Sequence, residues 1–117
     1  MHPNHVRLIA VEPTRVKALL ERREAVLVDV READEWEVEH IPGAMHVPLS
    51  RFAASAVPEL PGKPVVLHCL AGARSSKAAD ILFRSGRLDV MHMRGGLTGW
   101  KMAGLETVQA TAVRRLA

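Results

Sequence analysis

Three short apolar runs, rich in β-branched residues, constrain the fold of this 117-residue chain more than any other feature. They are AVLVDV at 25–30, PVVLHC at 64–69 and LDVMHM at 88–93. Each is a short and nearly unbroken apolar run, which is typical of a strand that is covered on both faces of its sheet. The chain is therefore expected to build its core around buried strands.

Segments with helical spacing separate these runs. A helix is predicted over 15–24, where Val16, Leu19 and Leu20 share one face, and a second helix is predicted over 75–86. Shorter elements are expected as a strand at 8–13, one or two helical turns at 31–40, a turn and brief strand at 41–48, a short helix at 49–56 and another at 97–104.

This alternation predicts an α/β fold in three layers, with a mainly parallel five-stranded sheet and helices on both of its faces. The length suffices for one domain, so residues 1–117 are expected to form a single domain with a core at about 8–105 and a peripheral tail at 106–117. In such folds ligands bind beyond the carboxyl ends of the strands.

Composition narrows the classes of function. The net charge is +3, but basic residues are scattered among acids and no aromatic residues are interleaved with them, so neither nucleic acid nor membrane is an expected partner. The single cysteine excludes an internal disulfide and fits a reducing cytoplasm. The N-terminal segment lacks the pattern of a signal peptide, and no apolar run reaches the roughly 20 residues that cross a bilayer. We therefore expect a cytoplasmic protein.

Cys69, the only cysteine, ends the central apolar run at the edge where a ligand is expected. A lone cysteine in this position is more often a buried, inert residue. However, the loop that follows is short, contains Gly72 and Arg74, and leads into serines that begin a helix. Backbone N–H groups in such a turn, the helix N-terminus and an arginine all stabilise an anion, and hence a thiolate. We therefore interpret Cys69 as a functional residue.

Four motifs in register resemble the rhodanese family. The loop CLAGARS at 69–75 is similar to the family's active-site pattern Cys-x-x-Gly-x-Arg-Ser. The segments VDVRE at 28–32, EHIPGAMHVPL at 39–49 and GGLTGW at 95–100 resemble three further family signatures. The likeness extends from about residue 9 to residue 104, which is nearly the whole chain.

The resemblance implies a sulfurtransferase without cofactor or metal. Cys69 would attack a sulfane-sulfur donor such as thiosulfate, hold the sulfur as a persulfide, and pass it to cyanide or a thiol by ping-pong kinetics. Asp29 and Arg31 would support the active-site loop, and the Arg74 side chain would either order the loop or bind the donor's oxyanion. Persulfide binding is implied for Leu70, Ala71, Gly72, Ala73, Arg74 and Ser75.

Departures from the family pattern keep other functions open. Leu70, Ala71 and Ala73 are apolar where efficient thiosulfate enzymes often carry basic or polar side chains, so modest turnover with thiosulfate is expected, and a protein persulfide or a polysulfide stays open as the donor. A non-catalytic persulfide carrier or polysulfide sensor is the alternative. An arsenate reductase or phosphatase is disfavoured, because that branch has five residues between its cysteine and arginine and this loop has four. Glu39 replaces a usual glycine, with no predicted effect.

Other chemistry-bearing residues have simpler interpretations. None of the six histidines forms a helical pair or a cluster with Cys69 at zinc-site spacing, so no metal is expected. His68 adjoins Cys69, but neighbouring strand residues point to opposite faces, which makes His68 a poor catalytic base. Trp100 is interpreted as a core anchor, and Trp36 as either a surface lid or a core residue.

Overall fold

The structure of the chain, a computed structural model, describes residues 8–109. Five strands form one sheet in the order β1-β5-β4-β2-β3, and all four neighbouring pairs are parallel. The strands are β1 (Ile9–Val11), β2 (Val26–Asp29), β3 (Met45–His46), β4 (Val65–His68) and β5 (Val90–Met93). The predicted α/β class with a parallel five-stranded sheet is confirmed, and β4 lies at the centre of the sheet.

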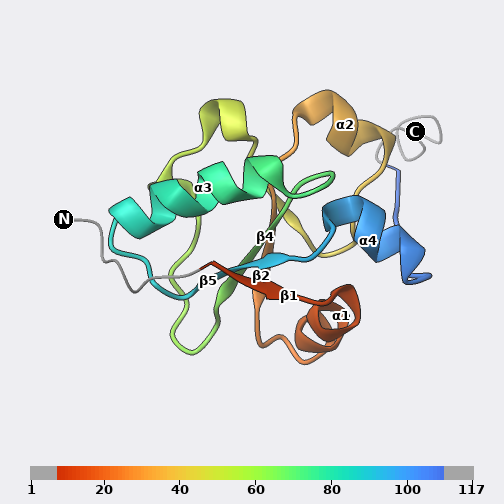
Figure 1. The fold of residues 1–117 in the computed structure, drawn as a ribbon, viewed down its shortest axis with the longest axis horizontal. Helices are drawn as coiled ribbons and strands as arrows, with labels where there is room; N and C mark the ends of the chain where they lie inside the picture. The colour runs from red at the N-terminus through yellow and green to blue at the C-terminus, as the bar shows by residue number, and fades with distance from the viewer. Residues whose placement is uncertain (1–7, 110–117) are drawn as a thin grey trace, which may run out of the picture.

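Helices cover both faces of the sheet (Figure 1). α3 (Ala73–Arg84) and the two 3₁₀ turns η1 (Leu49–Arg51) and η2 (Ala54–Ala56) lie on one side, and α1 (Pro13–Glu21) lies on the other. α2 (Ala33–Val38) and α4 (Gly96–Met102) lie toward the edge where the strands end. The chain therefore forms the expected three layers.

The buried residues form two clusters, one on each face of the sheet. Val65 and Leu67 of β4 belong to the cluster under α3, and Val66 between them belongs to the cluster under α1 and α4. This division follows from the strand geometry, in which successive side chains point to opposite faces. Cys69 lies two residues after Leu67, so its side chain points to the same face as those of Val65 and Leu67, the face covered by α3.

The helix predicted over 15–24 is observed as α1 at Pro13–Glu21, and the helices predicted over 75–86 and 49–56 also differ from the observed elements. α3 begins at Ala73 rather than at residue 75, because Gly72 takes a φ of 128° and turns the chain directly into the helix. The segment 49–56 forms two 3₁₀ turns instead of one helix, because Phe52 and Ala53 between them adopt extended backbone. That arrangement lets Leu49, Phe52 and Ala54 all pack against the core.

The segment after α4 packs against the domain as far as the structure describes it. The backbones of His40 and Val108 form an antiparallel bridge, and the indole N–H of Trp100 donates to the carbonyl oxygen of Glu106 at 2.8 Å. The contacts of this segment thus extend beyond the core boundary expected at residue 105. The end AVRRLA at 112–117, which the sequence predicts to be a frayed helix or a solvated end, lies outside the described residues.

Within residues 8–109, no helix combines the length and the apolar character that a membrane crossing requires.

Candidate active site

Cys69 lies directly after β4, at the carboxyl edge of the central strand. Its side chain is 1% exposed and packs in the apolar cluster under α3. The loop that covers it is itself exposed at Leu70 and Ala71. The sequence therefore placed the cysteine at the correct edge of the sheet, and the fold adds that the thiol is covered by its own loop.

One backbone donor of this loop points at the sulfur. The N–H of Gly72 lies 2.9 Å from Sγ of Cys69, and the thiol lies 3.9 Å from Oγ of Ser75. Among the described residues, no other backbone N–H donates to this sulfur in the present conformation. The resemblance implied a ring of donors from Leu70 to Ser75, and this conformation contains one member of such a ring.

Ser75 is fully buried in the first turn of α3, and its hydroxyl group helps to fix the conformation of the Cys69 loop. Its hydroxyl donates to the carbonyl oxygen of Gly72 at 2.9 Å, and the hydroxyl of Ser76 donates to the same oxygen at 3.3 Å. Two hydroxyls on one carbonyl hold the orientation of the Gly72 peptide. The opposite side of that residue presents its N–H to the sulfur of Cys69.

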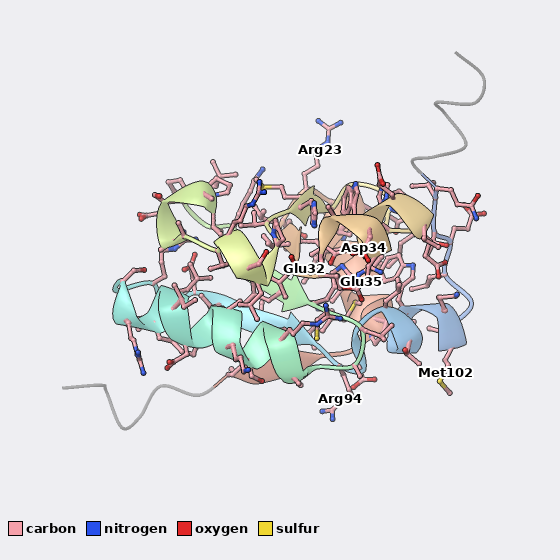
Figure 2. The ribbon with its side chains drawn as sticks, turned by 90° about the horizontal axis from the view of Figure 1, so that it is seen from above. Arg23, Glu32, Asp34, Glu35, Arg94 and Met102 are labelled. Atoms are coloured by element: carbon pink, nitrogen blue, oxygen red, sulfur yellow. The ribbon has the colours of Figure 1, made fainter. Side chains whose placement is uncertain are left out.

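Arg74 pairs with the carboxylate of Glu35, a partner that no pattern in the sequence indicates. Its guanidinium donates from Nη1 to Oε1 of Glu35 at 2.6 Å and from Nη2 to Oε2 at 2.9 Å. This two-pronged pair joins α2 to the start of α3. Figure 2 shows Glu35 on the side of α2 that faces α3. The hydrogen bonds from Arg74 lower the pKa of Glu35 from 4.5 to about 2. Of the two roles left open for Arg74, the geometry fits the ordering of the loop.

Replacing Glu35 by glutamine should remove a pH dependence of stability. Because the folded-state pKa lies below the unfolded one, the carboxylate stabilises the fold above about pH 4.5, and this contribution is lost as pH falls toward about 2. We expect Glu35→Gln to cost about 1 kcal/mol at pH 7, since both side chains are 30% exposed. Urea unfolding at pH 3 to 7 measures this. A wild-type advantage that stays constant across that range would contradict it.

The N-terminal turn of α4 holds the backbone on the other side of the cysteine. The N–H of Leu97 donates to the carbonyl oxygen of Cys69 at 2.8 Å, and the N–H of Thr98 donates to that of Leu70 at 3.2 Å. Gly96 makes this approach possible, because a Cβ at this position would collide with the carbonyl oxygens of Cys69 and Leu70. The glycine at position 96 thus allows the backbone of α4 to lie directly against the backbone of Cys69 and Leu70.

Gly96→Ala should therefore lower the stability of the fold and disturb the conformation of the Cys69 loop. We expect a loss of about 2–4 kcal/mol, which combines a positive φ with overpacking against backbone atoms that cannot rotate away. Gly104→Ala is the matched control, because Gly104 also has a positive φ, but within residues 8–109 no atom beyond Gly104 and its two chain neighbours lies within 4 Å of the position its Cβ would take. Thermal or urea unfolding compares the two variants. Equal losses would mean that the close contact with Cys69 and Leu70 contributes nothing.

Asp29 and Arg31 form a buried ion pair beneath this edge of the sheet. Nη2 of Arg31 lies 2.8 Å from Oδ2 of Asp29 and 2.7 Å from the carbonyl oxygen of Glu39, so the pair links β2 to the end of α2. Neither side chain has a hydrogen bond to Sγ of Cys69. This arrangement supports the role of structural support rather than direct chemistry.

His68 contacts the carbonyl oxygen of Cys69 rather than its sulfur. Nδ1 of the ring lies 3.2 Å from that oxygen, and Nε2, which has no hydrogen-bond partner among residues 8–109, lies 3.5 Å from Oδ2 of Asp29. Burial lowers the pKa of His68, against the opposing effect of Asp29. The neutral ring can therefore donate its single proton to the Cys69 carbonyl, and its position does not suit a base for the thiol.

Glu39, the departure from the family pattern, has a structural explanation. Its carboxylate accepts from Nζ of Lys101 at 2.8 Å and from Oγ1 of Thr107 at 2.7 Å, and these bonds lower its pKa. One side chain thus joins the end of α2, α4 and the C-terminal segment. Neither this cluster nor the Glu35–Arg74 pair leaves a signal in the sequence, because the partners lie 39 or more residues apart.

Trp36 and Trp100 occupy different environments. Trp100 is buried in the cluster under α1 and α4, as expected of a core anchor. Trp36 is half-buried and stacks on the rings of His40 at 3.6 Å and His46 at 4.8 Å between centroids. Trp36 is therefore neither a free lid nor a core residue, and it braces the loop after α2.

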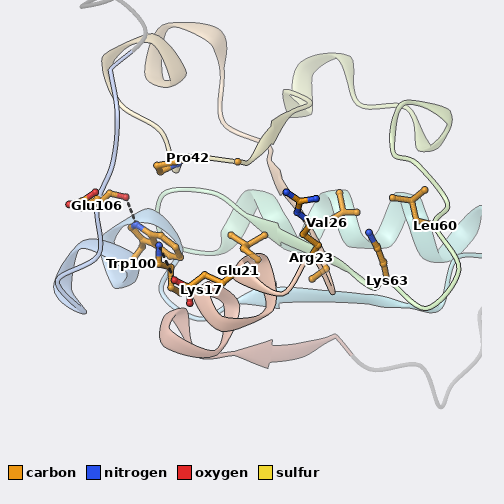
Figure 3. Close-up of a pocket in the computed structure, with 12 residues that line it drawn as sticks. Lys17, Glu21, Arg23, Val26, Pro42, Leu60, Lys63, Trp100 and Glu106 are labelled. Carbon is orange, nitrogen blue, oxygen red and sulfur yellow. Dashed lines mark hydrogen bonds and ion pairs between the residues drawn. The ribbon is translucent and has the colours of Figure 1, made fainter.

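The cavity between α1 and two loops lies apart from Cys69, and the described residues contain no cluster of metal-binding side chains. A cavity of about 430 Å³ lies between α1 and the loops at 42–43 and 60–63, and Cys69 is not among its lining residues (Figure 3). No three residues among the histidines, cysteine and acids of 8–109 lie close enough to hold a metal ion. The single cysteine at the carboxyl edge of the sheet is thus the candidate reactive group of this site.

The fold and site together define a class: a parallel α/β domain that presents one cysteine in a short loop between its central strand and a helix. A comparison with known protein families then identifies the family to which this domain belongs. The rhodanese-like domain family model matches residues 12–103. The chain belongs to the rhodanese-like family.

Individual relatives agree with this assignment. The chain is 40% identical over 101 residues to the uncharacterized protein slr1261 of Synechocystis, covering 86% of this chain and 56% of that protein. It is 32% identical over 83 residues to the thiosulfate sulfurtransferase GlpE of Coxiella burnetii, covering 71% of this chain and 78% of GlpE. The rhodanese-like domain of the Anabaena protein Alr3790 is 25% identical with a TM-score of 0.77, covering 95% of this chain and 86% of that domain.

The chain spans 56% of the length of the Synechocystis relative and 62% of that of YqhL from Bacillus subtilis. Relatives of this family thus include longer proteins.

Proposed function

We propose that the protein is a sulfurtransferase in which Cys69 carries sulfane sulfur as a persulfide. The observation that carries the proposal is the position of the thiol, at the carboxyl end of the central strand with the Gly72 N–H directed at its sulfur. The 32% identity to GlpE, a thiosulfate sulfurtransferase, supports this class of reaction. A reducing cytoplasm, which keeps a single cysteine as a thiol, is the proposed setting.

The proposed reaction consists of two displacements at sulfur. In the first, the Cys69 thiolate attacks the outer sulfur of thiosulfate, a Cys69 S–S bond forms, and sulfite leaves with the electron pair of the broken bond. In the second, cyanide or a thiolate attacks the outer sulfur of the persulfide, and the electron pair of the S–S bond returns to Sγ. No external oxidant or reductant enters, and the two half-reactions give ping-pong kinetics.

Both displacements require the loop to open. With Cys69 1% exposed, a donor cannot reach Sγ in this conformation. The exposed residues Leu70 and Ala71 face solvent above it, and Gly72 has the conformational freedom to change φ. The N–H groups of 70–75 are the proposed partners of the outer, anionic sulfur of the persulfide.

Intact mass spectrometry tests the proposal. The protein is measured before and after exposure to thiosulfate, and again after cyanide or dithiothreitol. We expect a gain of one sulfur that cyanide removes as thiocyanate. Because the chain contains one cysteine, the site of the added sulfur is unambiguous. Complete absence of this species with thiosulfate and with a persulfide donor would refute the function.

A second candidate is a non-catalytic persulfide carrier or polysulfide sensor. The covered thiol and the absence of a free cation in the described loop at 69–75 favour it, since Arg74 is occupied by Glu35. A carrier would gain sulfur in the same mass experiment but would produce thiocyanate at a negligible rate. Steady-state turnover with thiosulfate and cyanide distinguishes the two.

Phosphate chemistry is the disfavoured class. Four residues separate Cys69 from Arg74, one fewer than in the phosphatase and arsenate-reductase pattern. Hydrolysis of an aryl phosphate by the wild type that is lost in Cys69→Ser would reinstate it.

A further inference from the structure

Arg74 carries the only permanent charge among the side chains of the loop at 69–75. Its guanidinium lies within electrostatic range of the cysteine. Hydrogen bonds to Glu35 are the main cause that raises the pKa of Arg74, and the negative charge of Cys69 is a further cause. The Arg74 side chain is also 30% exposed, so a reagent that approaches from solvent meets it. Arg74 is therefore the cation that could draw an anionic donor toward the thiol.

The carboxylate of Glu35 cancels this positive charge. It accepts both prongs of the Arg74 guanidinium, at 2.6 and 2.9 Å. The same carboxylate is fixed from its other side, because Oε1 also accepts the N–H of Glu32 at 3.0 Å in the capping box of α2. A two-pronged pair that is anchored at a helix start is held in one geometry. An incoming reagent therefore meets Arg74 together with its counter-charge.

The rest of the loop offers no second cation. Residues 70–73 are uncharged, and the buried pair of Asp29 and Arg31 beneath the loop cancels its own charges. A dianion that leaves water for such a site gives up more hydration than a monoanion or an uncharged molecule does, and a neutralised arginine returns little of that loss. These charges thus favour reagents that carry little negative charge.

We propose that Glu35 selects by charge the reagents that reach Cys69, and that the sulfur donor of this protein carries less negative charge than thiosulfate. The inference rests on the proposed sulfur transfer and specifies its donor. Singly charged or uncharged sulfane-sulfur compounds, such as thiosulfonates and organic polysulfides, form this class. Glu35 acts through Arg74 and does not touch the reacting sulfur, so it is a specificity-determining residue.

Two donors that differ by one charge make the inference testable. Methanethiosulfonate has a methyl group where thiosulfate has a negatively charged oxygen. With either donor the Cys69 thiolate attacks the outer sulfur and forms an S–S bond, and the bond from the outer sulfur to the oxidised sulfur breaks. Methanesulfinate or sulfite leaves with the electron pair of that bond, and the same persulfide remains on Cys69. The backbone N–H groups of the loop act on the outer sulfur, which both donors share.

Glu35→Gln removes the charge while its amide oxygen can still accept the N–H of Glu32 in the capping box. The rates of sulfur uptake from the two donors are measured by intact mass. We expect the ratio of the thiosulfate rate to the methanethiosulfonate rate to rise about tenfold in this variant, as one unit charge near a protein surface would cause. A loosened loop alone would speed both reactions equally. A ratio unchanged from the wild type would therefore overturn the inference.

Asp34→Asn is the matched control variant. Asp34 carries the same charge one residue earlier on α2 and is exposed (Figure 2), whereas both prongs of Arg74 go to Glu35. The ratio of the two rates in Asp34→Asn should stay close to the wild-type value. A rise as large as that in Glu35→Gln would overturn the inference, because the overall charge of the protein and not the pair with Arg74 would then decide the preference.

Alkylation separates this inference from the proposed function, because it needs no sulfur donor. Iodoacetate and iodoacetamide both react with a cysteine thiolate and differ by one negative charge, and the chain has no other cysteine. The ratio of the iodoacetate rate to the iodoacetamide rate should rise about tenfold in Glu35→Gln and stay near the wild-type value in Asp34→Asn.

The alkylation and sulfur-uptake results together identify which statement fails. The expected rise of the alkylation ratio in a protein that never gains sulfur would support charge selection by Glu35 while refuting sulfur transfer. Sulfur uptake by the wild type, with an alkylation ratio that Glu35→Gln leaves unchanged, would overturn the inference while the proposed function stands.

Discussion

Replacing Cys69 by serine is expected to abolish sulfur uptake and to lower thiocyanate formation by at least roughly a thousandfold, as loss of a nucleophile does in other covalent mechanisms. The hydroxyl oxygen cannot form a persulfide. Because the chain has no second cysteine, no other thiol can take over the role. Intact mass after thiosulfate treatment and steady-state turnover with cyanide measure the two effects.

The serine variant should retain the fold, which makes the result interpretable. Serine is close to cysteine in size, and the Gly72 N–H that points at Sγ can donate to a hydroxyl oxygen instead. Circular dichroism and the unfolding midpoint of Cys69→Ser should therefore remain near those of the wild type. A folded Cys69→Ser protein that still forms thiocyanate at the wild-type rate would disprove the mechanism.

Removing the carboxylate of Asp29 is expected to produce the largest loss of stability. Asp29 is fully buried and Arg31 is 2% exposed, so Asp29→Ala leaves a buried guanidinium without its counter-charge. Breaking one half of a buried pair typically costs about 3–5 kcal/mol, because the remaining charge has lost both water and partner. Urea unfolding at pH 7 measures the loss, and the midpoint should fall without a change of slope.

Asp80→Ala is the matched control for this prediction. Asp80 pairs with Arg84 at 3.0 Å, but both side chains are exposed on α3, so the loss there should stay below about 1 kcal/mol. A double variant, Asp29→Leu with Arg31→Met, should recover much of the stability, since no buried charge remains. If Asp29→Ala costs no more than Asp80→Ala, the buried pair does not support the site.

The local sequence was sufficient to predict the layers of the fold. The apolar runs at 25–30, 64–69 and 88–93 became β2, β4 and β5, because an apolar strand is stable only when both of its faces are covered. The same reasoning placed Cys69 at the carboxyl edge. α2 lies within its expected segment, and α1 overlaps its expected segment but begins at Pro13 and ends at Glu21. The least accurate prediction was 49–56, where extended backbone at Phe52 separates two short turns.

The motifs of the loop could be recognised in the sequence, but their partners could not. Arg74 was expected either to order the loop or to bind an oxyanion, and its pairing with Glu35 depends on how α2 packs beside α3. The same holds for Gly96, whose lack of a side chain matters only because the Cys69 carbonyl lies against it. Contacts of this kind join segments far apart in the chain and have no periodicity.

The sequence by itself determined the class of the fold, the family and the position of the single cysteine at the carboxyl edge of the sheet, since these follow from apolar periodicity and from residue types at short spacing. Only the tertiary structure decided that the thiol is covered and that Arg74 and Lys101 are paired with carboxylates. The physical reason is that burial and ion pairing depend on which distant surfaces meet, whereas strand and helix patterns depend on neighbours along the chain.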